Sequence, residues 1–272
     1  MEWSCFERLM ELRNPGHIDD AIRESEILLE QTSDPDERAG LLTGEHVCYC
    51  ILGRLTEARR VLAEIQRLEI SDAEVRLNAE FCEPCLLIAE GKVEEGVSAF
   101  SLMLQRNGEL FREARFRYLY EDIQSRRAWA LFGLSRCGEA LPLLREVVSF
   151  SLEDVADEQR MHFALGVCLD ETGESGPAKQ EFFHTIGLNL NNDHEERARY
   201  RLARLLVGEY AFAQARKQLE MIVQNYESRA PTVSAKYVYQ QLSHVCSHLG
   251  DAKAEKLYAD LAKVADKESR SM

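Results

Sequence analysis

The sequence has little proline and few segments that favour β-strands. Only six prolines occur in 272 residues, and β-branched residues rarely alternate with polar ones, as they do in half-buried strands. Apolar residues instead recur at intervals of three and four, as in Leu55, Ala58, Leu62 and Ile65. This spacing is typical of amphipathic helices, so we expect an all-α protein.

Long apolar runs and an excess of positive charge are also missing. No apolar run approaches the roughly 18 residues that a membrane-spanning helix needs. The formal net charge is −14 and the isoelectric point is near 5.1. Non-specific binding to nucleic acid or to an anionic membrane needs a basic surface, so we expect neither as a partner.

The densest basic run does not change this expectation. Its arginines point in different directions around a helix and have acidic neighbours at Glu195 and Glu196, so we expect mostly a solvated face. The run consists of Arg197, Arg199, Arg201 and Arg204.

Motifs for catalysis and for cofactor binding are absent. The sequence has no nucleophile elbow, no glycine loop for phosphate and no zinc-hydrolase helix motif. We therefore expect a protein that is not an enzyme and has no cofactor. Five histidines are scattered along the chain, namely His162, His184, His194, His244 and His248.

Cysteine is present, with eight residues, but they fall in helical segments of a chain too large to need disulfides. Reduced thiols in a cytoplasmic protein are the favoured interpretation. The segment Met1–Leu12 carries three glutamates and no basic region, so we expect no secretory signal there.

One cysteine pair, Cys82 and Cys85, has the spacing of a metal or redox motif. A structural zinc site formed by this pair with His46 and Cys50 is a minor alternative. Cys48 lies about 200° around a helix from Cys50 and cannot easily share an ion with it. The favoured interpretation is that these cysteines and His46 are core residues, and that Pro84 bends its helix locally.

Small residues recur at a nearly constant interval along the whole chain. The steps between them are 37, 38, 44, 38, 37 and 39 residues, and such a period indicates a stacked helical array. We expect the long step to contain a longer connection near Asn107 and Gly108 and a long helix after it. The small residues are Ala21, Ala58, Gly96, Ala140, Ala178, Ala215 and Ala254.

Each period predicts one helix–turn–helix unit, and together the units form a single domain over residues 1–272. Asp34, Ser71, Ser151 and Asn192 are the expected N-caps, and glycines are expected at the turns. The turn glycines are Gly16, Gly53, Gly91, Gly173 and Gly250. The expected helix pairs are 2–13 with 17–31, 36–52 with 54–69, 72–90 with 92–106, 110–135 with 137–150, 153–171 with 175–189, 194–207 with 209–227, and 232–248 with 251–267.

Two units carry a recognisable pattern of large, small and turn residues. The second has Leu42, Tyr49, Gly53, Leu55, Ala58, Leu62 and Ile65, and the fifth has Leu165, Gly166, Leu169, Gly173, Ala178 and Phe182. The chain thereby resembles a degenerate tetratricopeptide repeat (TPR) protein. It departs from the family pattern at His46 and Pro84, where a small residue is usual. The resemblance implies a right-handed α-solenoid superhelix of about seven repeats.

The resemblance also implies where partners bind, because TPR arrays hold them on a concave face lined by the first helix of each repeat. Counting back from the recurring small residue of each second helix places aromatic and basic residues on this face. The alternative is that the aromatic residues pack in the core. The residues are Phe81, Trp129, Phe132, Arg160, Phe163, Arg197, Tyr200, Arg204, Lys236 and Tyr239.

We therefore expect a protein-interaction scaffold that binds a peptide segment or a partner helix. The residues of the family's carboxylate clamp are not present at the matching positions, which hold Phe163 and Tyr200 among others. A regulatory module that acts by self-association is the alternative, and the sequence leaves the oligomeric state and the partner's identity open.

Overall fold

The structure is a computed structural model that describes residues 18–150, 152, 154–226 and 230–271. In this range it contains α-helices, two short 3₁₀ turns and no strand, which confirms the all-α prediction. The helix expected at residues 2–13 and the turn at Gly16 lie outside the described residues. No described helix combines the length and the apolar composition needed to cross a membrane.

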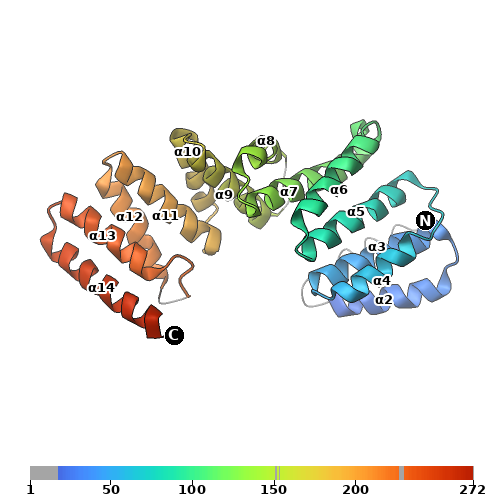
Figure 1. The fold of residues 1–272 in the computed structure, drawn as a ribbon, viewed down its shortest axis with the longest axis horizontal. Coiled ribbons are helices and arrows are strands. Elements are labelled where there is room, and N and C mark those ends of the chain that lie inside the picture. The colour runs from blue at the N-terminus through green and yellow to red at the C-terminus, as the bar shows by residue number, and fades with distance from the viewer. Residues whose placement is uncertain (1–17, 151, 153, 227–229, 272) are drawn as a thin grey trace. The chain divides into compact units, whose positions relative to one another are not determined.

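The order of the helices follows the predicted units (Figure 1). The helices are α2 (Ile18–Gln31), α3 (Pro35–Ile51), α4 (Leu55–Ile65), α5 (Ala73–Ala89), α6 (Val93–Arg106), α7 (Arg117–Gly133), α8 (Cys137–Val147), α9 (Val155–Glu171), α10 (Ser175–Gly187), α11 (Asp193–Gly208), α12 (Phe212–Asn225), α13 (Ala235–His248) and α14 (Ala252–Ser271).

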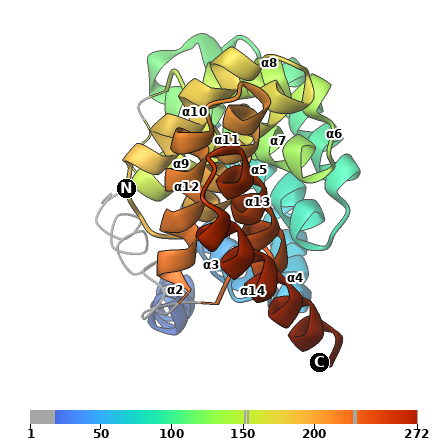
Figure 2. The ribbon, with the colours of Figure 1, turned by 90° about the vertical axis from the view of Figure 1, so that its left-hand side faces the viewer.

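The chain divides into two compact units, Met1–Ala130 and Leu131–Met272, which we describe separately. In the first unit α3 packs on α2, α4 and α5, and α5 packs on α6. In the second unit each helix from α8 to α14 packs on the next one in sequence, and α12, α13 and α14 lie side by side in Figure 2. A single domain over residues 1–272 stays a prediction.

A left-handed backbone residue closes the turn between the two helices of each predicted pair from α3 onward. Four of these residues are the expected glycines, Gly53, Gly91, Gly173 and Gly250, with φ between 68° and 86°. Glycine adopts this conformation at little steric cost because it has no Cβ. Ser135 (φ 57°) and Tyr210 (φ 60°) occupy the same place in the other two turns.

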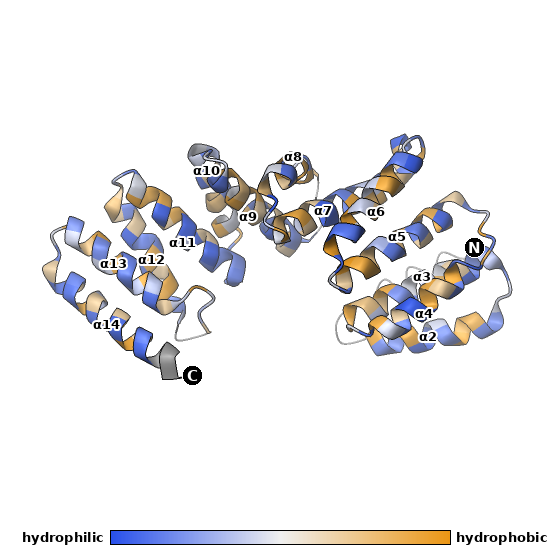
Figure 3. Cartoon of the chain, in the orientation of Figure 1, coloured by the Kyte–Doolittle hydropathy of each residue, from blue (hydrophilic) through white to orange (hydrophobic). Residues whose placement is uncertain are grey.

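The recurring small residues lie where helices approach closely. Ala21, Ala58, Ala140, Ala178 and Ala215 are fully buried. At Gly96 a Cβ atom would lie 2.9 Å from the carbonyl oxygen of Pro84, so the contact of α6 with α5 requires glycine there. Figure 3 shows apolar and polar residues interleaved along the helices, in agreement with the predicted amphipathic pattern.

The helix starts confirm some of the predicted N-caps and correct others. Asp34 and Asn192 cap α3 and α11 as expected. The predicted cap Ser71 is wrong, because Asp72 accepts the first backbone N–H groups of α5. Asp154 caps α9, and the predicted cap Ser151 lies outside the described residues. An aspartate directly before the helix is nearer to these donors and carries the charge that the helix N-terminus favours.

The long step near residue 110 is explained by two 3₁₀ turns, Leu110–Arg112 and Ala114–Phe116. The prediction of one helix over 110–135 is therefore wrong at its start. Glu113 is extended, with ψ 135°, and Phe116 is fully buried, so the chain folds its ring inward before α7 begins. The bend expected at Pro84 does not divide α5, which runs as one helix from Ala73 to Ala89.

Candidate partner-binding surface

A buried ion pair joins the first and second turns of α11. The Arg199 guanidinium donates to Glu195 Oε1 from Nη2 at 2.8 Å and from Nε at 3.1 Å, and to Gln218 Oε1 of α12 at 2.8 Å. The side chains of Arg199 and Glu195 are only 11% and 5% exposed. Arg201 donates to Asp170 of α9 at 3.2 Å. The prediction that this basic run is mostly solvated is therefore wrong for these residues.

The other two arginines of the run, Arg197 and Arg204, are exposed. With Tyr200 between them, they lie three, four and seven residues apart, so their side chains share one face of α11. Neither arginine forms an ion pair within the part of the chain that the structure describes. The rise of about 1.5 Å per residue separates them by about 10 Å along the helix axis.

Helix α13 adds aromatic surface beside this face. Tyr237 of α13 is 54% exposed, and Tyr200 of α11 is half-buried. Burial is the main cause that raises the pKa of the half-buried Tyr200 phenol. We name the group Arg197, Tyr200, Arg204 and Tyr237 the α11–α13 surface.

Two further basic residues of the predicted site lie in the same unit but have intramolecular partners. Lys236 Nζ binds Asp266 of α14 at 2.6 Å, and its ammonium lies 5.9 Å from the centre of the Tyr237 ring. Arg160 of α9 pairs with Asp157 at 2.8 Å. These cations already have counter-charges, which lowers their attraction for an acidic partner.

The predicted aromatic residues divide between core and surface. Phe81 and Phe163 are buried, with 7% and 3% exposure, and Phe81 packs on Phe100 with ring centres 5.3 Å apart. Phe132 is half-buried and meets Phe163 edge to face at 6.2 Å. Trp129 is also half-buried. Phe81 and Phe163 thus stabilise the fold and offer little surface to a partner.

Tyr239 has an intermediate position. It is half-buried, and its ring lies 6.2 Å from that of Tyr226 and 6.3 Å from that of Tyr258. Its neighbour Tyr237 is the more exposed residue, although the sequence analysis did not predict Tyr237 as a binding residue. A sign was available in the sequence, because two tyrosines separated by one residue on a helix cannot both face the core.

Comparison with known proteins shows that the fold of this chain is similar to that of several solved structures, although the sequences differ strongly. No protein-family model matches the sequence, and no curated protein matches it. Among solved structures, the apo form of RapI has a TM-score of 0.74 at 10% identity, covering 97% of this chain and 76% of that chain. PilF of Pseudomonas aeruginosa has a TM-score of 0.59 at 16% identity, covering 87% of this chain and 98% of that chain. MamA from Desulfovibrio magneticus has a TM-score of 0.53 at 18% identity, with coverages of 71% and 97%.

The chain has a TPR-like helical-repeat fold. These similarities confirm the predicted fold class, and at such low identities they extend to the fold alone. The sequence analysis predicts that the first helix of each repeat lines the binding face. Helices α11 and α13 are the first helices of their pairs, so the α11–α13 surface lies on the elements that the prediction named.

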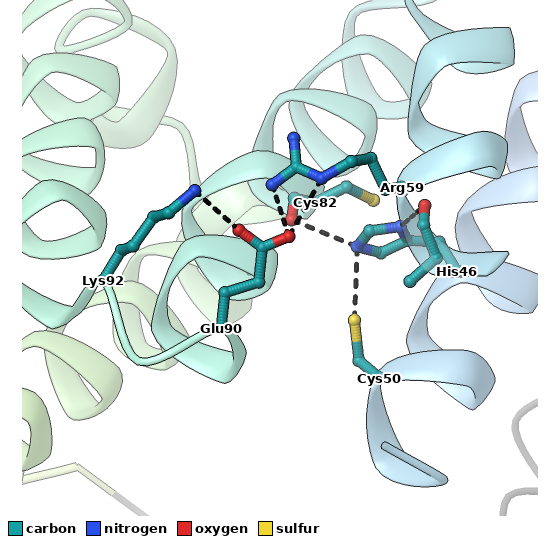
Figure 4. Close-up of polar contacts among 7 residues, drawn as sticks. His46, Cys50, Arg59, Cys82, Glu90 and Lys92 are labelled. Atoms are coloured by element: carbon teal, nitrogen blue, oxygen red, sulfur yellow. Dashed lines mark hydrogen bonds and ion pairs between the residues drawn. The ribbon is translucent and has the colours of Figure 1, made fainter. Parts of the chain in front are cut away.

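The second predicted cluster, around His46, forms contacts of a different kind from a metal site. The His46 ring is fully buried; its Nδ1 lies 3.0 Å from the carbonyl oxygen of Ala58 and its Nε2 lies 3.1 Å from that of Cys82 (Figure 4). Burial lowers the pKa of His46. The imidazole thus bridges α4 and α5 of the TPR-like array through backbone carbonyl groups.

The cysteines near His46 do not gather around one point. Cys50 Sγ lies 3.5 Å from His46 Nε2, and burial raises the pKa of its thiol to about 11. Cys82 meets the ring through its carbonyl oxygen, and its thiol packs in the core around α3 and α4, whereas Cys85 packs in the core around Phe100 and Phe116. Among the described residues, these four do not form a group with metal-ligand spacing.

Ion pairs on the outer side of this region connect neighbouring hairpins. The Glu90 carboxylate accepts hydrogen bonds from Arg59 of α4, from Nε at 2.9 Å, and from Lys92 Nζ at 3.1 Å, as Figure 4 shows. The hydrogen bond from Arg59 and then that from Lys92 hold the pKa of Glu90 below its usual value. The contacts of His46 and Glu90 thus hold neighbouring helices of the first unit together.

Two of the histidines that the sequence analysis described as scattered lie together in the second unit. The ring centres of His162 on α9 and His184 on α10 are 3.8 Å apart. Each histidine contacts a glutamate of the other helix, at 2.6 Å for His162 with Glu181 and 2.8 Å for His184 with Glu158. The spacing of glutamate and histidine by four and by three residues was the sequence signal for this group.

Proposed function

We propose that this TPR-like chain is a non-catalytic scaffold that binds an acidic segment of a partner protein on the α11–α13 surface. The observation that carries the proposal is the pair Arg197 and Arg204. Both are exposed, share one helix face, and lack an ion-pair partner among the described residues. The chain as a whole carries a net charge of −14, so the two cations lie on an otherwise acidic molecule.

The chemistry of the surface fits a carboxylate-bearing peptide. A guanidinium binds a carboxylate through two parallel hydrogen bonds, which gives direction as well as affinity. Tyr200 and Tyr237 add large rigid contact areas with few rotatable bonds. The separation of about 10 Å along α11 matches acidic residues two turns apart on a partner helix, or three residues apart on an extended segment.

The cysteines support a cytoplasmic location for this interaction. Five of the seven described cysteines are buried, and burial raises the pKa of Cys137 and Cys246 above that of an ordinary thiol. Buried protonated thiols react slowly and are usual in proteins of reducing compartments.

A peptide-display selection on the full chain tests the proposal. We expect the enriched peptides to contain acidic residues and their affinity to fall with rising salt, because exposed charges are screened. Arg197→Glu/Arg204→Glu should weaken binding at least tenfold, and Tyr237→Ala should weaken it severalfold. Circular dichroism should show that both variants keep the helical content of the parent.

The matched control is Arg67→Glu/Arg106→Glu, which reverses two exposed arginines of the first unit and changes the net charge by the same amount. This variant should bind the selected peptides like the parent. Peptides without acidic residues, or equal losses in both double variants, would show that the α11–α13 surface is not the binding site.

A further inference from the structure

We propose that Glu158, His162 and His184 form a binding site for Zn²⁺, with Glu181 orienting His162. The three ligands come from both helices of one hairpin in the second unit. Glu158 and His162 are four residues apart on α9, so they face the same side of that helix. His184 projects from the adjacent helix α10, and its Nε2 lies 2.8 Å from Glu158 Oε1.

The distances fit a single small ion. One ligand atom from each of the three residues lies within 4.8 Å of the other two. Ligand atoms about 2.0–2.1 Å from a tetrahedral zinc ion are about 3.4 Å apart, so small side-chain rotations complete the geometry. The imidazole rings are already close, with centres 3.8 Å apart and planes inclined by 31°.

The choice of zinc follows from the donor set. Two imidazoles and one carboxylate suit zinc and its transition-metal neighbours, whereas Mg²⁺ and Ca²⁺ prefer oxygen ligands alone. Zinc sites with three protein ligands keep a fourth position for water. Two of the three ligands are in contact with solvent here, since the side chain of His184 is 43% exposed and that of Glu158 is 32% exposed.

Glu181 supplies the outer contact that histidine ligands of metals usually have. Its Oε2 lies 2.6 Å from His162 Nδ1, and both side chains are mostly buried, at 22% and 14% exposure. A carboxylate on one ring nitrogen fixes the ring orientation and makes the other nitrogen a better ligand. His162 would therefore bind the ion through Nε2.

The proposal is tested by titrating the full chain with zinc chloride after removal of metals by chelation and dialysis. We expect one zinc ion per chain by calorimetry, and a rise in Tm on zinc addition, because an ion that binds only the folded state stabilises it. Substitution of cobalt for zinc should give visible absorption without a thiolate charge-transfer band, which excludes the cysteines as ligands.

Three single substitutions distinguish a loss of zinc binding from a loss of the fold. His184→Gln, at the most exposed ligand, should weaken zinc binding at least tenfold and abolish the Tm rise. Glu181→Gln should weaken binding by about 10- to 100-fold, as outer contacts do. His248→Gln, at an exposed histidine of α13 in the same unit, should bind zinc like the parent.

Failure of the parent to bind zinc, or unchanged binding in both His184→Gln and Glu181→Gln, would overturn the proposal. In that case the four residues form two histidine–carboxylate hydrogen bonds between α9 and α10 and nothing more. Equal loss of binding in His248→Gln would likewise overturn it.

Discussion

The Asp36 carboxylate on the first turn of α3 accepts the backbone N–H of Ser71 at 2.8 Å, which connects one hairpin to the start of the next. The same carboxylate accepts the Asp72 N–H at 3.1 Å. In the second unit Glu196 of α11 accepts the N–H groups of Thr232 and Val233, at 3.0 Å and 2.7 Å. An acidic residue in the first turn of a helix thus holds the segment that leads to the next repeat in both units.

Asp36→Asn should destabilise the chain at neutral pH and less so in acid. The hydrogen bond from the Ser71 side chain is the main cause that holds the pKa of Asp36 below its ordinary value. A carboxylate with a lowered pKa stabilises the folded state above its unfolded pKa of about 3.9, and this stabilisation is lost as the pH falls through the folded pKa. Urea denaturation at pH 7, 5 and 3 measures the difference between parent and variant.

The matched control is Asp19→Asn, at an aspartate in the first turn of α2 for which no such backbone acceptor role exists among the described contacts. Its effect should be small at every pH. A difference between parent and Asp36→Asn that grows towards pH 3 would contradict the assigned role of the carboxylate.

Tyr210→Gly should stabilise the second unit by about 0.5–1 kcal/mol. A left-handed backbone costs a residue with a Cβ about 1–2 kcal/mol, and the greater freedom of glycine in the unfolded chain offsets part of this gain. Tyr210 is 81% exposed, so little packing is lost with its ring. Chemical denaturation measures the change.

The converse substitution checks the argument at the equivalent turn of the preceding hairpin. Gly173 has φ 86° and no atom within 4 Å of a Cβ position, so Gly173→Ala should be destabilising because of backbone strain alone. If alanine is tolerated at residue 173 without loss of stability, the strain assigned to Tyr210 is wrong.

Gly166→Ala should destabilise the second unit by about 1–3 kcal/mol, which is the usual cost of overpacking a core. A Cβ at residue 166 would lie 2.8 Å and 2.9 Å from two ring carbons of Phe182, and that ring is fully buried. The control is Gly176→Ala in α10, where no atom lies within 4 Å and the higher helix propensity of alanine should raise stability. Thermal unfolding should move the two Tm values in opposite directions.

Arg199→Met should destabilise the chain by about 3–5 kcal/mol, because it leaves the buried Glu195 carboxylate without its counter-charge. Combining it with Glu195→Gln should restore part of the loss, since the buried charge is then removed as well. A double-mutant cycle by urea denaturation measures the coupling between the two positions. Additive effects would mean that the ion pair contributes little beyond the packing of each side chain.

The sequence predicted those features of the fold that depend on local chemistry. The small residues and turn glycines mark the repeats because a Cβ is excluded at Gly96 and a left-handed residue is needed at Gly53. Ser135 and Tyr210 fill the same turn position without any local signal, since the surrounding helices impose the conformation. The 3₁₀ turns before α7 depend on the burial of Phe116, which apolar periodicity does not distinguish from helix.

The candidate surface was predictable only in part. Helical spacing gives the face on which Arg197 and Arg204 lie, but not whether a neighbouring helix covers that face. Phe163 and Arg199 follow the same periodicity as exposed positions, and both are buried against adjacent elements. The group around His162 depends on how α9 and α10 align, and in that contact Gly166 packs closely against Phe182.

The left-handed residues Gly173, Tyr210 and Gly250 divide the second unit at equivalent points, each between the two helices of a predicted pair. The chain from residue 174 to Tyr210 begins and ends at the same place in a hairpin, and helices there contact mainly their neighbours in sequence. A recombination event that duplicates or removes this segment would preserve every turn. The number of repeats can therefore change in evolution while the remaining hairpins keep their sequences. Arg197 and Arg204 both lie in this segment, so they would be duplicated or lost together.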